Sequence, residues 1–338
     1  MKPHTFNFAT KTGTIMRFTT TITAMLLALC TSLNAQERTT PHGKPILQVF
    51  TNFHSGFGAV NDDRGFELER SYLGYEYSFN KALSIKGVMD IGKSDDVNDY
   101  QRIAYIKNAL VSWNSGHMTL NAGLIGTTQF SNQEKFWGYR YIYKSFQDQY
   151  RFGNSADLGI SLSYRLARWI EADAIITNGE GFKQLQVNDG LLYGIGTTIT
   201  PLKGVSMRLY ASLNEGTDGA KDIINYAMFA GYKNRYFSFG LEYNIMRNSK
   251  RIDGRNLYGF SMYASGTLNS WFNVYARTDG LMSSDDWNKE GDEVTLIAGA
   301  QFKIGKNIRI APNFRMAIPK ADEVENRYYG YINCSFGL

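Results

Sequence analysis

The feature that most constrains the fold of this chain is an alternation of apolar and polar residues, which recurs from Pro45 to the C-terminus. In Val205–Asn214 every odd position is apolar and most even positions are polar. The segments 158–166 and 293–303 repeat the pattern, and Ile297 is the one apolar residue on the polar face of the latter. A period of two is that of a β-strand whose successive side chains point to opposite faces. The alternation therefore predicts strands with one face in an apolar medium and the other in water.

The pattern predicts sixteen strands in one antiparallel, closed, transmembrane β-barrel, although fourteen or eighteen strands stay open if a weak pair is merged or split. Short connections alternate with long ones, which is typical of transmembrane barrels with short periplasmic turns and longer external loops. A soluble sandwich would not sustain the pattern over the whole chain. Strand 102–113 is the weakest, because Lys107 interrupts one face while polar residues lie on the other. The predicted strands are 46–57, 66–79, 83–92, 102–113, 118–126, 156–166, 169–178, 190–200, 205–214, 224–232, 236–246, 257–265, 271–279, 292–303, 308–318 and 326–338.

Mean hydropathy separates this prediction from a helical membrane protein. The value is −0.32, whereas a multi-helix membrane protein needs several spans of about 20 apolar residues. A barrel is compatible with a polar average, since its strands are apolar on one face only. Closure also pairs every backbone amide that lies in lipid.

The N-terminus predicts export. A basic region, the apolar run 22–33 and a small residue at Ala35 together resemble a cleavable signal peptide over residues 1–35, with Met16 as an alternative start. A membrane anchor and a lipoprotein acylated at Cys30 are less favoured, because the run is short and Leu29 fits a lipobox poorly. The barrel domain is then 36–338. The leader holds three of the 36 basic residues and no acidic residue, so the remainder has 33 basic and 31 acidic residues. This nearly neutral charge argues against a nucleic-acid partner.

Three tryptophans, Trp113, Trp169 and Trp271, lie at strand ends beside short turns. This placement favours an aromatic girdle at a membrane interface over the general preference of aromatic residues for strands.

The polar face of the predicted strands carries many charges. Buried dry, they would have a large desolvation cost, but sixteen strands leave room for a wet channel. The bases that we expect to line the pore and attract anions are Arg70, Lys86, Arg208, Arg277, Arg309, Arg315 and Arg327. Acids share the same interior, namely Glu76, Asp90, Glu171, Asp173, Glu242 and Glu293.

One connection differs from the others. Residues 127–155 form the third external connection and are rich in aromatic residues, which would be costly to leave in water. We expect this loop to fold inward and narrow the pore, with Lys135, Trp137, Arg140, Tyr141 and Lys144 at the constriction. An external lid or a latch between subunits of a trimer is the alternative.

Several segments resemble porins of the phosphate-selective O/P type. They are 66–77, with the letters FELERSYLGYEY, the following Asp90-Ile91-Gly92, the aromatic stretch 133–148, and 155–159. The resemblance implies a trimeric, sixteen-stranded barrel with an internal narrowing. It also implies that arginine and lysine side chains handle phosphate groups. The chain departs from the usual barrel ending in its last residue, Leu338, although Phe336 lies on the same face.

Residues typical of enzymes are sparse. After the leader only His42, His54 and His117 remain, with no cysteine cluster, so neither a metal site nor a cofactor is expected. His54 and Ser55 are adjacent in a strand and point to opposite faces, which excludes that pair as a hydrolytic couple.

We therefore expect a non-enzymatic porin in the outer membrane of a Gram-negative-type cell envelope. It would pass small hydrophilic solutes, with a weak anion or phosphate preference, and would contact outer-membrane lipid and lipopolysaccharide as a homotrimer. A surface adhesin or scaffold with a plugged lumen is the alternative, and an outer-membrane hydrolase is the less favoured third reading.

Overall fold

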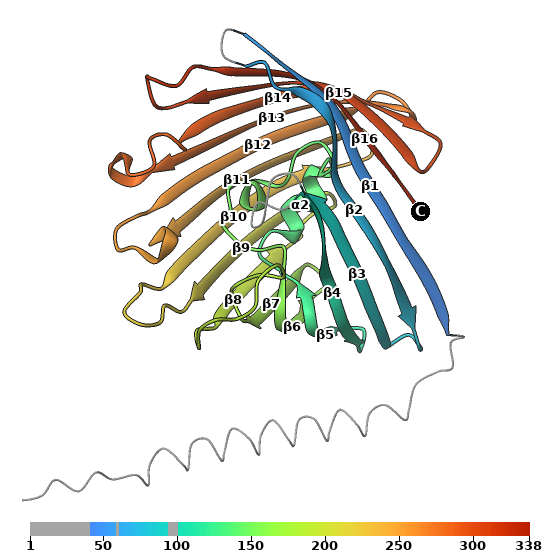
Figure 1. The fold of residues 1–338 in the computed structure, drawn as a ribbon. Helices are drawn as coiled ribbons and strands as arrows, with labels where there is room; N and C mark the ends of the chain where they lie inside the picture. The colour runs from blue at the N-terminus through green and yellow to red at the C-terminus, as the bar shows by residue number, and fades with distance from the viewer. Residues whose placement is uncertain (1–40, 59–60, 94–100) are drawn as a thin grey trace, which may run out of the picture.

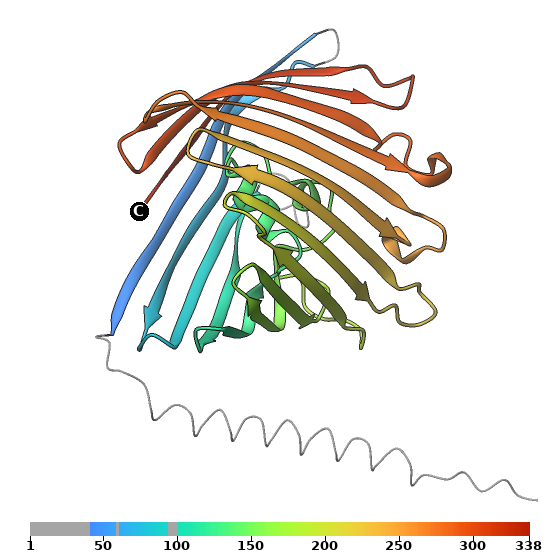
Figure 2. The same cartoon turned by 180° about the vertical axis from the view of Figure 1, so that it is seen from behind.

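A computed structural model describes residues 41–58, 61–93 and 101–338. The predicted signal peptide lies outside the described residues. The sixteen predicted strands are confirmed, and they form one closed antiparallel barrel in which each strand pairs with its neighbours in the chain and β1 pairs with β16 (Figures 1 and 2). Closure pairs β1 with β16 from Gln48 to Phe57, so this part of β1 is not an open sheet edge.

The strands begin and end close to the predicted positions. They are β1 (His42–Phe57), β2 (Arg64–Ser78), β3 (Leu83–Lys93), β4 (Arg102–Asn114), β5 (Met118–Gly126), β6 (Ala156–Ala167), β7 (Ile170–Thr177), β8 (Leu192–Ile199), β9 (Val205–Asn214), β10 (Ile223–Lys233), β11 (Phe237–Arg247), β12 (Leu257–Thr267), β13 (Phe272–Ser283), β14 (Glu293–Ile304), β15 (Ile308–Pro319) and β16 (Arg327–Gly337). Short helices lie in the connections: α2 (Ser131–Trp137), α3 (Phe146–Gln149), η2 (Ser249–Arg251) and η3 (Ser284–Asp286).

The start of β1 shows why a strand boundary was misplaced. The strand begins four residues before the predicted start, in a stretch whose Gly43 and Pro45 are typical of a turn. Residues 42–47 pair with β2, whereas pairing with β16 begins only at Gln48. Pro45 is tolerated because it lies where β1 has a neighbour on one side only.

The predicted division into two faces is confirmed. On β9, Met207 and Leu209 are about half exposed, while Ser206, Arg208 and Tyr210 are buried. Ile297, the exception noted on β14, is also buried, because it packs in an apolar cluster inside the barrel. The outward faces therefore form an apolar belt, and the inward faces carry the polar side chains.

Two β-bulges change which residues face inward. The β1–β2 register shifts so that Glu69 has no partner on β1, and the β3–β4 register shifts so that Lys107 has none on β3. A bulge inserts one extra residue, so two successive side chains can point to the same face. Glu69 and Arg70 both point inward, as do Lys107 and Asn108. The bulge is the physical reason why Lys107 broke the alternation of β4 in the sequence.

Short turns at one end of the barrel and longer connections at the other match the predicted alternation. Trp169 and Trp271 are about half exposed beside short turns, as are Tyr232 and Tyr236. Exposed aromatic side chains at the short-turn end are the arrangement expected for a girdle.

Within the described part of the chain, no helix combines the length and the apolar character that a membrane span requires.

Candidate functional site: the barrel lumen and the 127–155 segment

The connection between β5 and β6, residues 127–155, meets the inward-facing side chains of strands from both halves of the barrel. Its helix α2 packs against β10 and β11, and α3 packs against β12. The Tyr141 hydroxyl donates to Gln301 on β14 at 2.9 Å, and the Tyr263 hydroxyl donates to the Gln133 carbonyl at 3.1 Å. Figures 1 and 2 show the ribbon of this segment within the ring of strands.

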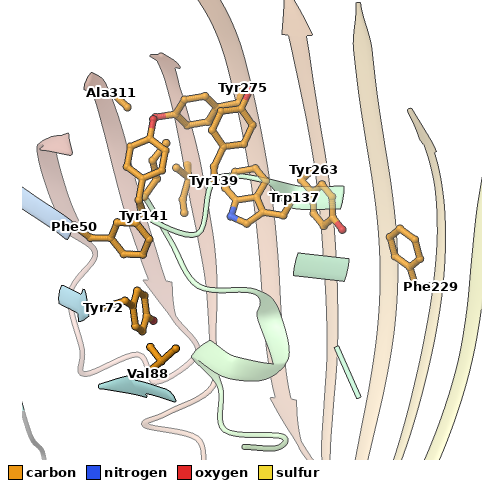
Figure 3. Close-up of a cluster of buried hydrophobic side chains, with 12 residues drawn as sticks. Phe50, Tyr72, Val88, Trp137, Tyr139, Tyr141, Phe229, Tyr263, Tyr275 and Ala311 are labelled. Carbon is orange, nitrogen blue, oxygen red and sulfur yellow. The ribbon is translucent and has the colours of Figure 1, made fainter. Parts of the chain in front are cut away.

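An aromatic cluster joins this segment to the wall. Trp137, Tyr139 and Tyr141 are buried, and they pack with residues from opposite sides of the ring (Figure 3). The Tyr139 ring lies 4.7 Å from that of Tyr275, and the Tyr141 ring lies 6.2 Å from that of Phe50. The other members of the cluster are Tyr72, Val88, Phe229, Tyr263, Ile297, Ala311 and Ile142. Burial of this much aromatic surface fixes the segment across the lumen.

Polar side chains on the wall hold the backbone of the segment. The Arg277 guanidinium donates to the Lys144 carbonyl at 2.9 Å, and that of Arg315 donates to the Ile142 carbonyl at 2.7 Å. The Arg208 guanidinium donates to the Thr128 carbonyl at 2.8 Å. Buried backbone carbonyls of an irregular segment need such partners, and charged donors form the stronger bonds.

Arg140 is at the centre of a charged group that connects the segment to β2. Its guanidinium donates to Glu134 and to Asp148, both at 2.8 Å, and to the Tyr72 hydroxyl on β2 at 2.8 Å. Burial raises the pKa of Asp148, but the positive charges of Arg140, Lys144, Lys107 and Arg70 together outweigh burial and lower the pKa below its ordinary value. Asp148 is therefore a carboxylate at neutral pH and holds Arg140 in place.

Arg208 forms an ion pair with an aspartate that lies two strands away. It lies on β9, and its guanidinium forms two hydrogen bonds, of 2.7 and 2.9 Å, with Asp173 on β7. The intervening residue on β8 is Gly196, where a Cβ atom would lie 2.5 Å from the Arg208 guanidinium. Gly196 has no side chain and so makes room for this crossing.

Two cavities lie on either side of the segment. The first, of about 590 Å³, is at the end with the long connections and is lined by seven basic and four acidic side chains. The second, of about 450 Å³, is bounded by β6–β9 and α2 and is lined by four basic and two acidic side chains. Basic side chains outnumber acidic ones in both cavities.

The structure places the predicted pore-lining bases in different settings. Arg70 pairs with Asp90 at 2.5 Å and Arg315 stacks on Tyr331 at 3.6 Å, and both line the larger cavity. Lys86 lies 3.9 Å from Glu76, and Arg327 lies 2.6 Å from Glu293. Arg208 and Arg277 are almost fully buried, each against an aspartate. Arg309 pairs in register with Lys303 of β14.

The predicted residues of the constriction are distributed over the two sides of the segment. Lys144 and Arg140 line the larger cavity, and Lys135 lines the smaller one. Trp137 and Tyr141 are buried in the aromatic cluster.

Sequence reasoning missed several residues that contact the segment. Tyr72, Tyr263, Asp279, Gln301 and Asn333 all lie on inward faces and bond to the segment or to its anchors. Strand parity assigns each of them to the interior, but the partner across the lumen depends on tertiary placement that parity does not give.

Among the described residues, no group of three or more histidine, cysteine, aspartate or glutamate side chains is placed to hold a metal ion. Cys334 on β16 is a free thiol.

No protein-family model matches the sequence, and no curated protein matches it significantly. Similar solved structures include the anion-selective porin from Comamonas acidovorans, with 13% identity, a TM-score of 0.67, and coverage of 88% of this chain and 100% of that one. OmpF of Salmonella typhi, solved in complex with daunomycin, has 10% identity, a TM-score of 0.66, and coverage of 88% and 97%. OmpT of Vibrio cholerae has 13% identity, a TM-score of 0.64, and coverage of 90% and 99%. The chain shares its barrel fold with these outer-membrane proteins over nearly their whole lengths.

Proposed function

We propose that this protein is an outer-membrane porin through which small hydrophilic solutes diffuse passively. The observation that carries the proposal is the closed sixteen-stranded barrel with an apolar outer face, a charged inner face and water-accessible cavities on both sides of one internal segment. Charged side chains inside such a barrel are stable when they line water. The signal peptide, over residues 1–35, would deliver the chain to the outer membrane, where the apolar belt meets lipid and lipopolysaccharide.

Liposome swelling tests this proposal. Vesicles that contain the refolded chain should swell in isotonic arabinose faster than empty vesicles, and the rate should fall with the size of the sugar. Folded barrel that leaves the swelling rate at the level of empty vesicles would contradict passive diffusion.

The segment 127–155 is proposed as the constriction. It meets both sides of the lumen through the aromatic cluster and Arg140, so the path for solute is what remains between it and the wall. Deletion of residues 136–146 removes most of this obstruction and should raise single-channel conductance.

A weak anion preference is proposed from the excess of basic side chains in both cavities. Selectivity in a wide pore follows the balance of the charges that line it. In a potassium chloride gradient, the reversal potential should have the sign of chloride permeation and should fall toward zero when Arg315 and Lys144 are both replaced by Gln. A cation-selective wild-type pore would contradict this assignment.

The resemblance to phosphate-selective porins supports two finer proposals, a phosphate preference and a homotrimer. Phosphate should reduce chloride current in a concentration-dependent way if the guanidinium groups of the larger cavity bind it. Chemical crosslinking in outer-membrane vesicles should give a trimer.

A second candidate function is an adhesin or scaffold with a plugged lumen. The aromatic cluster favours it, since buried side chains from β1–β3, β10 and β12–β15 meet through Trp137, Tyr139 and Tyr141. The swelling experiment separates the two functions, because a plugged barrel would remain impermeable while folded.

A further inference from the structure

Behind the 127–155 segment lies a second polar site that the solute path does not use. Glu242 and Asn244 on β11 and Ser261 on β12 are 1% or less exposed. Glu242 and Ser261 are direct partners in the β11–β12 register, and the Asn244 amide lies 3.4 Å from the Glu242 carboxylate. Directly opposed side chains on one face of a sheet lie about 5 Å apart.

The helices of the segment close this site. On α2, Phe136 packs 4.9 Å from the ring of Phe229, which is the cross-strand partner of Glu242. Gln133 lies one turn earlier on the same helix and is fully buried. On the other side, the Phe146 ring of the segment fills the space above Gly259, the partner of Asn244.

Most of the polar atoms in this enclosure are oxygens without a partner. The side-chain oxygens Glu242 Oε1, Asn244 Oδ1, Ser261 Oγ and Gln133 Oε1 make no hydrogen bond, and neither does Gln133 Nε2. A buried polar atom without a partner is destabilising, so several in one enclosure point to a site for a polar ligand.

The charge of the enclosure shows which kind of ligand fits. The charged neighbours of Glu242 are Arg277 and Asp279. The Arg277 guanidinium forms hydrogen bonds of 2.8 and 2.7 Å with the two Asp279 oxygens, so this pair neutralises itself. Glu242 then adds a carboxyl group to neutral amide and hydroxyl oxygens, which is the type of ligand set that a hard cation prefers.

We propose that Glu242, Asn244, Ser261 and Gln133 bind a calcium ion between the barrel wall and α2, with water completing the coordination. Gln133 belongs to the segment and the other three residues belong to the wall, so the ion fastens the segment to the wall. One carboxylate among neutral ligands gives weak binding, with a Kd on the order of 10⁻⁴–10⁻³ M.

Terbium luminescence tests the site without any measurement of transport. Tb³⁺ replaces Ca²⁺ and is excited through nearby aromatic rings, here Trp137 and Tyr263. Refolded barrel, free of lipopolysaccharide and treated with chelator, should show luminescence that Ca²⁺ displaces at a stoichiometry of about one ion per chain. Glu242→Gln should weaken this binding at least tenfold.

One control variant and a second variant of the proposed site complete the terbium experiment. Glu171→Gln removes a carboxylate that lines the smaller cavity and should leave the affinity unchanged. Heat-modifiable mobility on a gel shows whether Glu242→Gln folds. If it does not fold, Ser261→Ala provides the test. This variant removes one oxygen with little change in volume and should weaken ion binding several-fold. Absence of a Ca²⁺-displaceable signal, or equal affinity in folded Glu242→Gln and wild type, would overturn the proposal whatever the transport activity is.

Discussion

Arg208 and Asp173 show how single residues organise the lumen. Both are about 95% buried, and their ion pair forms across a glycine on the strand between them. The same guanidinium holds the first turn of the 127–155 segment through Thr128. One pair of side chains thus links three strands and the segment.

Removal of one member of this ion pair should strongly destabilise the folded barrel. Asp173→Ala leaves the Arg208 guanidinium buried without its carboxylate, which should lower the free energy of unfolding by about 3–5 kcal/mol. Urea unfolding in lipid vesicles, followed by tryptophan fluorescence, measures the change. Glu171→Ala, two residues away on the same face, is the matched control and should change stability by about 0.5 kcal/mol or less. Equal losses in the two variants would show that the ion pair is not what stabilises this region.

Gly259 tests whether the wall positions α3. A Cβ atom at this residue would lie 2.0 Å from the Phe146 ring, which is fully buried. Gly259→Ala should therefore push α3 from the wall and increase the fluctuations of the open-channel current. Gly330→Ala is the control, because a Cβ atom there meets nothing within 4 Å. If both variants behave as wild type in planar-bilayer recordings, α3 does not affect the solute path.

The internal segment contains a charged group that connects it to the barrel wall. Its Arg140 is held by Glu134 and Asp148 and reaches β2 through Tyr72. The inward-pointing side chains around it arise partly from the bulges at Glu69 and Lys107, which no regular alternation contains. Bulges next to functional regions commonly redirect side chains in this way.

Acid should loosen this segment. The pKa of Asp148 is lowered in the folded state despite burial, because Arg140 and the neighbouring bases Lys144, Lys107 and Arg70 together stabilise the carboxylate. Its contribution to stability is therefore complete above the unfolded pKa of about 4 and is lost as the pH falls through the lower, folded pKa. Channel-current fluctuations should be constant between about pH 5 and 8 and should increase only below about pH 4.

Asp148→Asn separates this carboxylate from the others. The variant should show the acid-state fluctuations already at pH 7, because its neutral amide no longer balances Arg140. A wild-type transition centred above about pH 5 would contradict the lowered pKa.

For the whole molecule, the sequence predicted the barrel, the strand number, the inward and outward faces and the order of short and long connections. It could do so because each strand carries its own period-two pattern, which depends only on local residue order. It placed the residues of the wall by parity, and Arg70, Arg208, Arg277 and Arg315 are among the inward-facing side chains that the structure shows.

The contacts across the lumen could not be predicted in the same way. The pairings of Tyr141 with Gln301 and of Tyr263 with the Gln133 carbonyl join residues 130 or more positions apart. The two helices of the segment, α2 and α3, are short and depend on burial against the wall, so no helical periodicity in the sequence predicts them. The bulge at Lys107 appeared in the sequence only as an interruption of the pattern.

The most direct test of the central claim is single-channel conductance in planar bilayers, with the refolded chain 36–338 compared with the same chain lacking residues 136–146. A porin with an internal constriction predicts discrete, stable current steps for the wild type and larger steps for the deletion variant. Equal steps would show that the segment does not limit the path. If the wild-type barrel is folded by circular dichroism but gives no current steps, the result would contradict the porin and favour the plugged scaffold.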